Sequence, residues 1–193
     1  MLHAFGCSFT YGSSCRDPST DAWPQVLAKL LGTTCANWGE PSASNDRIWC
    51  TVAEQLHTVR TGDRVVVMMT FQSRRYFRGR HVTPAAGHAC DDAFYRWVHD
   101  DCGDSINFTQ NLNALHNVLR DHRYTITFTD ARPLLEAHKF GLARVADVKH
   151  PSVYIPRGLS FNRYIEPVDG MHPSTQGHTG IAHELWKGTQ GEN

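Results

Sequence analysis

The chain opens with Leu2-His3-Ala4-Phe5-Gly6-Cys7-Ser8-Phe9-Thr10-Tyr11-Gly12, and this stretch decides how the rest of the sequence is interpreted. An apolar run that ends in glycine and is followed by a small hydroxyl residue predicts a β-strand that breaks into a tight turn. Such a turn lifts Ser8 off the end of a sheet and leaves its backbone N–H facing a ligand, which is the geometry of a serine nucleophile. The same residues also fit an ordinary strand-end turn with a solvated hydroxyl. A catalytic interpretation therefore needs a base and an acid from elsewhere in the chain.

Length and charge limit the classes of function. The 193 residues suit one domain with a substantial core, so we expect a single domain over residues 1–193. Lys+Arg 19 balances Asp+Glu 19, which provides no net field to attract nucleic acid or an anionic membrane surface. No apolar run approaches the roughly 20 residues that span a bilayer, and the first strand leaves no room for a signal peptide. We therefore expect a cytoplasmic protein with neither a nucleic-acid nor a membrane partner.

Cysteine and histidine spacing argues against a metal centre. The six cysteines contain no CxxC pair, which favours reduced thiols in a chain of this size. Twelve histidines are present, and His172, His178 and His183 fall close together near the end of the chain. Because the sequence lacks the HExxH and CxxC spacings that make a zinc assignment strong, we expect no metal and no other cofactor.

Strand and helix patterns alternate along the chain. Apolar or β-branched runs predict strands at residues 2–5, 33–38, 64–70 and 124–129, with a short last strand within residues 153–165. Amphipathic patterns predict helices at residues 22–32, 45–60, 104–122 and 174–187, with a further short one at residues 134–140. The continuous apolarity of residues 64–70 is typical of a central parallel strand covered on both faces. The pattern predicts an α/β fold, with a parallel sheet between two layers of helices.

In such a sheet, ligands bind beyond the carboxyl ends of the strands. Ser8, the loop at residues 39–44 and the segment at residues 70–74 all follow predicted strands, so we expect them to meet at one edge. Residues 71–102 are the least regular part of the chain, and we interpret them as a lid or rim insertion whose substrate-facing residues are Arg74, Tyr76 and Trp97. An ordinary surface excursion fits that segment equally well.

A candidate base and acid lie just before the last predicted helix, in Asp169-Gly170-Met171-His172-Pro173-Ser174. An acid and a histidine three residues apart on a turn allow the carboxylate to hold one imidazole nitrogen, so that the other faces outward as a base. We expect Ser8 to be the proton donor to that base.

Taken together, Gly6-Cys7-Ser8-Phe9-Thr10-Tyr11-Gly12 and the run from Asp169 to His178 resemble the two ends of the SGNH/GDSL hydrolase superfamily. The resemblance is closest to small bacterial and phage members that carry Gly-Cys-Ser-Phe-Thr in place of Gly-Asp-Ser. It implies a flavodoxin-like three-layer α/β/α fold with about five parallel strands. It also implies ester hydrolysis through an acyl-enzyme on Ser8, with His172 as base and Asp169 as orienting acid.

The oxyanion positions depart from the pattern of that superfamily. The resemblance makes the backbone N–H of Ser8 one donor and places Ser42 where a glycine is usual. It also implies an asparagine side chain after the third strand, where this chain offers Gln72, Thr70 or, from the adjacent loop, Asn45. Losing one oxyanion donor costs about 3 kcal/mol of transition-state stabilisation, which makes these substitutions the main argument against efficient catalysis.

A second Gly-Asp-Ser, at residues 103–105, follows no predicted strand and precedes a helical pattern. We interpret Asp104 or Ser105 as the N-cap of that helix and not as a nucleophile.

The sequence leaves three functions open. The first is a serine esterase that acts on a small acyl ester, with an O-acetylated carbohydrate as the preferred substrate. The second is an acyltransferase that uses the same acyl-enzyme, and the third is a non-catalytic, phage-associated binding or structural protein that keeps the fold.

Overall fold

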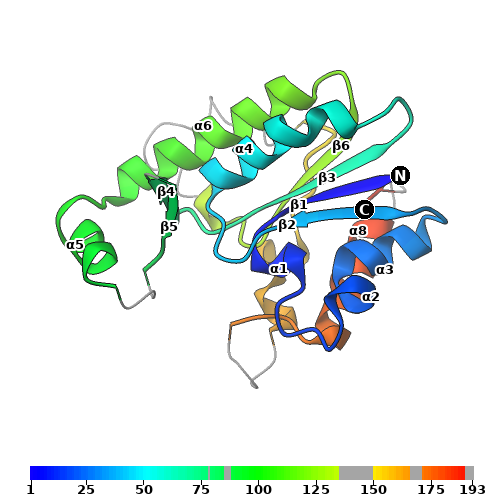
Figure 1. Cartoon of the computed structure of the whole chain (residues 1–193), viewed down its shortest axis with the longest axis horizontal. Coiled ribbons are helices and arrows are strands. Elements are labelled where there is room, and N and C mark those ends of the chain that lie inside the picture. The colour runs from blue at the N-terminus through cyan, green and yellow to red at the C-terminus, as the bar shows by residue number, and fades with distance from the viewer. Residues whose placement is uncertain (78, 85–87, 135–149, 166–170, 190–193) are drawn as a thin grey trace.

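Four parallel strands form the sheet at the centre of the molecule (Figure 1). A computed structural model describes residues 1–77, 79–84, 88–134, 150–165 and 171–189. The strands lie in the order β2-β1-β3-β6. They are β1 (Leu2–Gly6), β2 (Cys35–Gly39), β3 (Arg64–Met69) and β6 (Arg123–Phe128). Every residue of β1 is buried, as is every residue of β3 after Arg64, which agrees with their central positions.

A fifth chain segment extends the sheet beyond β6 by a single bridge. Val153 pairs with Ile126 in parallel, and the backbone N–H of Tyr154 donates to the carbonyl of Ile126 at 2.8 Å. The predicted last strand is therefore reduced to one bridge at the start of the expected range. The parallel topology itself is confirmed.

Helices cover both faces of the sheet (Figure 1). On one face lie α4 (Asn45–Gln55) and α6 (Asp101–Leu119), which pack on each other. On the other face lie α3 (Trp23–Leu30) and α8 (Thr175–Thr189), which also pack on each other. The three-layer architecture predicted from the sequence is confirmed.

Short elements complete the described chain. The one-turn helix α1 follows β1 directly, and the others lie in the connections between larger elements. They are α1 (Ser8–Tyr11), α2 (Pro18–Asp21), η1 (Leu56–Thr58), η3 (Arg157–Leu159) and η4 (Phe161–Tyr164). None of the helices in the described parts of the chain combines the length and the apolar composition needed to cross a membrane. All six cysteines are free thiols, as their spacing predicted.

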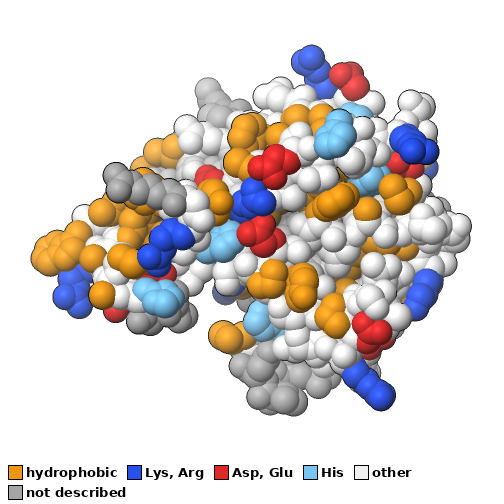
Figure 2. Space-filling view, viewed as in Figure 1, with side chains coloured by type: hydrophobic (Ala, Val, Ile, Leu, Met, Phe, Trp, Pro, Cys, Tyr) orange, Lys and Arg blue, Asp and Glu red, His pale blue; other side chains and the backbone are white. Residues whose placement is uncertain are grey.

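The segment at residues 71–102 is more regular than its sequence indicated. It contains an antiparallel hairpin, β4 (Arg75–Phe77) with β5 (Arg80–Val82), followed by α5 (Ala89–Trp97). Helix α5 projects from the body of the molecule (Figure 1), and the surface is hollowed between α5 and the main body (Figure 2). The hairpin strands are three residues long, which is too short for a periodic pattern to reveal them.

Helix α6 begins earlier than predicted. Its N-cap is Asp100, whose carboxylate accepts from the backbone N–H of Gly103 at 2.7 Å, so the prediction of Asp104 or Ser105 as the cap was wrong. Ser105 is buried within the helix. Leu112, Leu115 and Leu119 are fully buried on the inner side of α6, whereas Ile106 is 38% exposed. The short helix predicted at residues 134–140 lies almost entirely outside the described residues.

Two glycines let α1 approach the ends of the first two strands. A Cβ on Gly39 would lie 2.2 Å from the backbone nitrogen of Tyr11, and one on Gly6 would lie 2.1 Å from Oγ1 of Thr10. The side chain of Asn37 then fastens the turn, because its Nδ2 donates to the carbonyl of Thr10 at 2.9 Å. The position of Ser8 at the start of α1 therefore depends on bare backbone at both strand ends.

We expect Gly39→Ala to destabilise the protein by about 2–3 kcal/mol, because the new methyl group meets backbone atoms that cannot move without displacing α1. Urea unfolding measures the effect, with the exposed Thr33→Ala, just before β2, as the control. Equal stability of the two variants would contradict the close packing of α1 on β2.

Candidate active site

Ser8 is the first residue of α1, at the carboxyl end of β1. The preceding Cys7 has extended backbone and caps the turn, and Gly12 ends it with a left-handed φ of 96°. Ser8 is only 4% exposed, and its carbonyl accepts from the backbone N–H groups of Gly12 and Ser13. The N–H groups of Thr10 and Tyr11 donate to the carbonyl of Cys7 at 2.9 Å, whereas the first N–H groups of such a turn have no partner within the helix.

His172 lies just before α8 and close to α1 in space. Its ring centroid is 6.1 Å from that of Phe9, the residue after Ser8. The next residue, Pro173, forms an antiparallel bridge with Ile165, which fixes the approach of this turn to the body of the molecule. Asp169, the predicted orienting acid, lies outside the described residues.

Residues from near both ends of the chain line one cavity of about 620 Å³. Ser8 and His172 both line it, as do Ser42 and Arg74. Its other described lining residues are Ser13, Pro41, Phe71, Ser73, Thr83, Pro84, Asn162, Ile165 and Met171. The edge predicted from topology thus contains the predicted nucleophile, the predicted base and one oxyanion candidate.

The other predicted substrate-rim residues lie elsewhere. Tyr76 packs between Arg47, whose guanidinium carbon is 5.8 Å from the ring centroid, and His81, while Trp97 is 79% exposed at the end of α5. Neither lines the cavity. Of the three residues assigned to the rim, the structure places only Arg74 there.

Three polar residues grouped as oxyanion candidates have other positions. The amide of Asn45 accepts from the backbone N–H of Thr70 at 2.8 Å and donates to its carbonyl at 3.2 Å, so it holds the chain at the end of β3. The hydroxyl of the fully buried Thr70 accepts from Nη1 of Arg74 at 3.2 Å. Gln72 lines a different cavity, together with His99, and not the one that contains Ser8.

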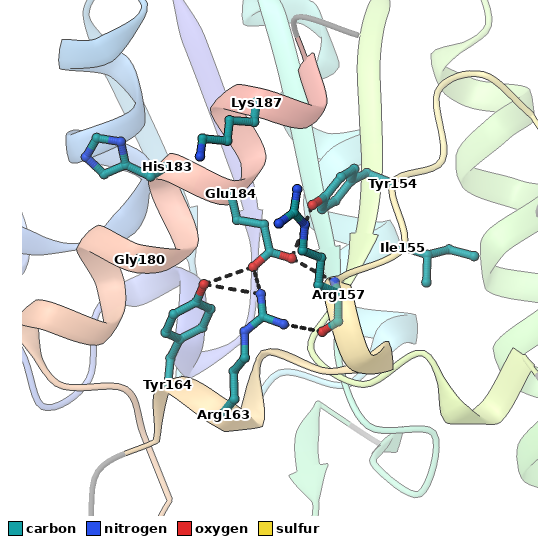
Figure 3. A pocket seen from close by; sticks show the side chains of 9 residues that line it. All are labelled: Tyr154, Ile155, Arg157, Arg163, Tyr164, Gly180, His183, Glu184 and Lys187. Carbon is teal, nitrogen blue, oxygen red and sulfur yellow. Dashed lines mark hydrogen bonds and ion pairs between the residues drawn. The ribbon is translucent and has the colours of Figure 1, made fainter. Parts of the chain in front are cut away.

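A second cavity, of about 440 Å³, lies along α8 and surrounds a dense polar network (Figure 3). Glu184 is 7% exposed and accepts from the hydroxyls of Tyr154 and Tyr164 at 3.1 and 2.9 Å. Its carboxylate also accepts from the backbone N–H of Arg157 at 2.8 Å and from Nη2 of Arg163. One buried carboxylate therefore attaches residues 154–164 to α8, and no sequence pattern indicated this role.

The attached segment forms a wall shared by both cavities. Asn162 and Ile165 line the cavity of Ser8, whereas Arg163 and Tyr164 line the cavity of Glu184. Glycine on α8 makes the close contact possible, because a Cβ on Gly180 would lie 2.4 Å from the ring of Tyr164. The network at Glu184 thus positions one wall of the candidate active site.

Within the described residues, no three His, Cys, Asp or Glu side chains gather in a way that would hold a metal ion. The described residues that line the cavity of Ser8 carry hydroxyl, imidazole, amide and guanidinium groups, a set that suits covalent acyl transfer through a serine.

The sequence matches no protein-family model and no curated protein. Solved structures match it over nearly the whole chain. A member of the lipolytic protein G-D-S-L family from Veillonella parvula is 13% identical, with a TM-score of 0.54 over 96% of this chain and 96% of that chain. A catalytic mutant of an acetylxylan esterase from Geobacillus stearothermophilus is 14% identical, with a TM-score of 0.58 over 96% of this chain and 92% of that chain. The chain has the SGNH-hydrolase fold.

A third similar structure is a family two carbohydrate esterase from Clostridium thermocellum in complex with cellohexaose. It is 13% identical, with a TM-score of 0.52, and the match covers 100% of this chain and 65% of that chain.

Within the SGNH-hydrolase fold, Ser42 takes the backbone conformation expected of a glycine. Its φ is 65°, in the left-handed region that L-residues other than Asn and Asp seldom enter. The resemblance noted in the sequence implies a glycine at this position, and the backbone of Ser42 has the φ that a glycine adopts readily.

We expect Ser42→Gly to be neutral or to stabilise the protein by up to about 1 kcal/mol, since glycine adopts this φ without strain. Ser42→Val should destabilise it by about 1–2 kcal/mol, because a β-branched residue is strained in the left-handed region. Thermal unfolding of the two variants tests this predicted order of stability. A glycine variant that is less stable than the valine variant would contradict the prediction.

His178, the last residue of the run from Asp169 to His178, lies inside the protein and away from solvent. It is fully buried, and its Nδ1 accepts from the backbone N–H of Trp23 at 3.1 Å, which joins α8 to the start of α3. Burial lowers the pKa of His178 from 6.5 to about 4. The imidazole is therefore neutral in the folded protein and becomes protonated more readily in the unfolded chain.

This difference makes stability depend on pH. The contribution of His178 is fully present above pH 6.5 and is lost as the pH falls from 6.5 toward about 4, because the unfolded chain then binds the extra proton. Over this pH range, the protonation of His178 lowers the free energy of unfolding by about 3 kcal/mol in total. His178→Asn offers an oxygen acceptor to Trp23 that does not titrate. We expect this variant to lose less stability than the wild type between about pH 7 and pH 4.5 in urea unfolding.

The exposed His57→Asn serves as the control and should keep the wild-type pH dependence. A His178→Asn variant with an unchanged pH dependence would show that burial of this imidazole does not govern acid stability.

Proposed function

We propose that the protein is a serine esterase, with Ser8 as nucleophile, His172 as general base and Asp169 as the acid that orients His172. The observation that carries the proposal is the shared cavity, which Ser8 and His172 line from opposite ends of the sequence. The fold supports it, because structures of the same fold include acetylxylan and other carbohydrate esterases.

In the proposed reaction, Oγ of Ser8 attacks the ester carbonyl and His172 takes its proton. The tetrahedral oxyanion is held by backbone N–H groups, for which Ser8 and Ser42 are the candidates. The imidazolium then gives its proton to the departing alkoxide, leaving the acyl group on Ser8. Water attacks this acyl-enzyme with His172 again as base, which releases the acid and restores the serine.

The preferred substrate is a small acyl ester, such as an O-acetylated carbohydrate. The cavity of about 620 Å³ has the size of a small-molecule site, and hydroxyls of Ser13, Ser42, Ser73 and Thr83 stand in its wall. The neighbouring carbohydrate esterases support an acetylated sugar in particular. Neither a cofactor nor a metal enters the proposed mechanism.

We expect Ser8→Ala to lose turnover of p-nitrophenyl acetate by about 10³-fold or more and to lose covalent labelling by a fluorophosphonate. His172→Ala should reduce turnover to a similar extent while the protein remains folded in circular dichroism. Ser19→Ala, on the exposed α2, and His57→Ala are the matched controls and should retain wild-type turnover.

Labelling that persists in Ser8→Ala would exclude the serine as nucleophile. Absence of both labelling and turnover in the wild type would favour the non-catalytic alternative. Transfer of the acetyl group to an added sugar or alcohol in preference to water would identify an acyltransferase.

A further inference from the structure

Arg74 is the one side chain with a permanent charge among the described residues that line the cavity of Ser8. The remainder of that lining consists of hydroxyl, amide, proline and apolar residues, with His172 as the only other titratable group. A half-buried guanidinium in a mostly neutral cavity creates a positive potential there, and the low local dielectric strengthens it.

The guanidinium of Arg74 is held in place from two sides. Its Nη1 donates to Oγ1 of Thr70 at 3.2 Å, and its central carbon lies 5.2 Å from the ring centroid of Phe71. Thr70 is itself fully buried, and its backbone is bonded in both directions to the amide of Asn45. The cation is therefore oriented before any ligand arrives, and within the described parts of the chain only Thr70 accepts a hydrogen bond from its guanidinium.

Two neighbouring arginines pair with carboxylates, whereas Arg74 has no such partner among the described residues. Arg75 pairs with Asp104, and Arg80 pairs with Asp91 at 2.5 Å. Among the described residues no carboxylate lies within ion-pair distance of Arg74. An arginine that is fixed by a hydroxyl and a ring, with no counter-ion among the described residues, is suited to bind an anion from solution.

We propose that the substrate is an anionic ester, and that its carboxylate or phosphate binds Arg74 while the ester carbonyl meets Ser8. The inference rests on the proposed function, in which the carboxylate of Asp169 accepts a hydrogen bond from His172 and the guanidinium of Arg74 is left to bind the substrate. Acylated acidic sugars belong to this chemical class. The anion can be part of the leaving group or of the acyl chain, and the two arms of the experiment separate these cases.

The experiment compares matched esters that differ only in charge. In the first arm, the acetate ester of a phenol with a carboxylate side chain is compared with the same ester carrying a neutral carboxamide. In the second arm, a succinyl ester is compared with the corresponding succinamyl ester of one phenol. Charge-assisted hydrogen bonds of this kind predict a kcat/KM about 10- to 100-fold higher for the anionic member in at least one arm.

Arg74→Gln should reduce that preference to about unity while neutral esters keep most of their kcat/KM, and Arg74→Lys should retain part of it. The exposed Arg60→Gln is the control and should keep the wild-type preference. Thermal unfolding checks that the Arg74 variants remain folded. Comparing the neutral glutamine variant with the charged lysine variant separates loss of anion recognition from structural damage.

Equal rates on charged and neutral esters in both arms would overturn the inference and leave the proposed esterase intact. If no ester is hydrolysed, calorimetric titrations with the carboxylate-bearing phenol and with succinate test anion binding separately from catalysis. Binding of either that Arg74→Gln weakens by about tenfold or more would support the anion site, and no binding of both to the wild type would reject it.

Discussion

The contact between α1 and the ends of β1 and β2 is the constraint on which the candidate site depends. A side chain at Gly6 or Gly39 would collide with the turn that begins at Ser8, and Asn37 fastens that turn from the neighbouring strand. Parallel strands bring their carboxyl ends to one edge of the sheet, which places Ser8 near that edge. The topology does not determine where the loop after the strand puts the side chain of Ser8. The close packing of α1 against the glycine backbone at the ends of β1 and β2 restricts where α1 can lie and so defines the position of Ser8.

On the opposite side of the cavity, the hydrogen bonds of Glu184 hold the wall in place. Residues 153–161 meet β6 and the residues just after it through isolated bridges at Val153 and Ser160, without the continuous ladder of a strand. Glu184 supplies the missing attachment through four donors, and Gly180 allows Tyr164 to lie flat against α8 (Figure 3). A buried carboxylate is costly unless its oxygens are well bonded, and here the same donors that satisfy it also orient the wall of the site. Stability and site geometry are consequently coupled through one residue.

The central fold could be predicted from the sequence, because each signal there is local. The apolar run of β3 and the capping serine of α4, Ser44, specify their elements without reference to distant residues. The cap of α6 was assigned wrongly because several residues near its start are good N-caps, and only the structure shows that Asp100 makes the bond. The Glu184 network escaped prediction for a different reason. Its members are separated by 20 to 30 positions, and none has a pattern of its own.

The oxyanion positions show how a residue type can mislead when its backbone is unknown. Gln72 and Asn45 were attractive in the sequence because an amide is the expected chemistry, yet Gln72 lines another cavity and Asn45 bonds the backbone of Thr70. Ser42 lacks the expected residue type but has the left-handed backbone of a glycine and lines the cavity with Ser8. An oxyanion donor needs an N–H in the right place, and the backbone supplies it whatever the side chain. Of the proposed oxyanion residues, Ser8 and Ser42 line the cavity, whereas Gln72 and Asn45 have the other positions described above.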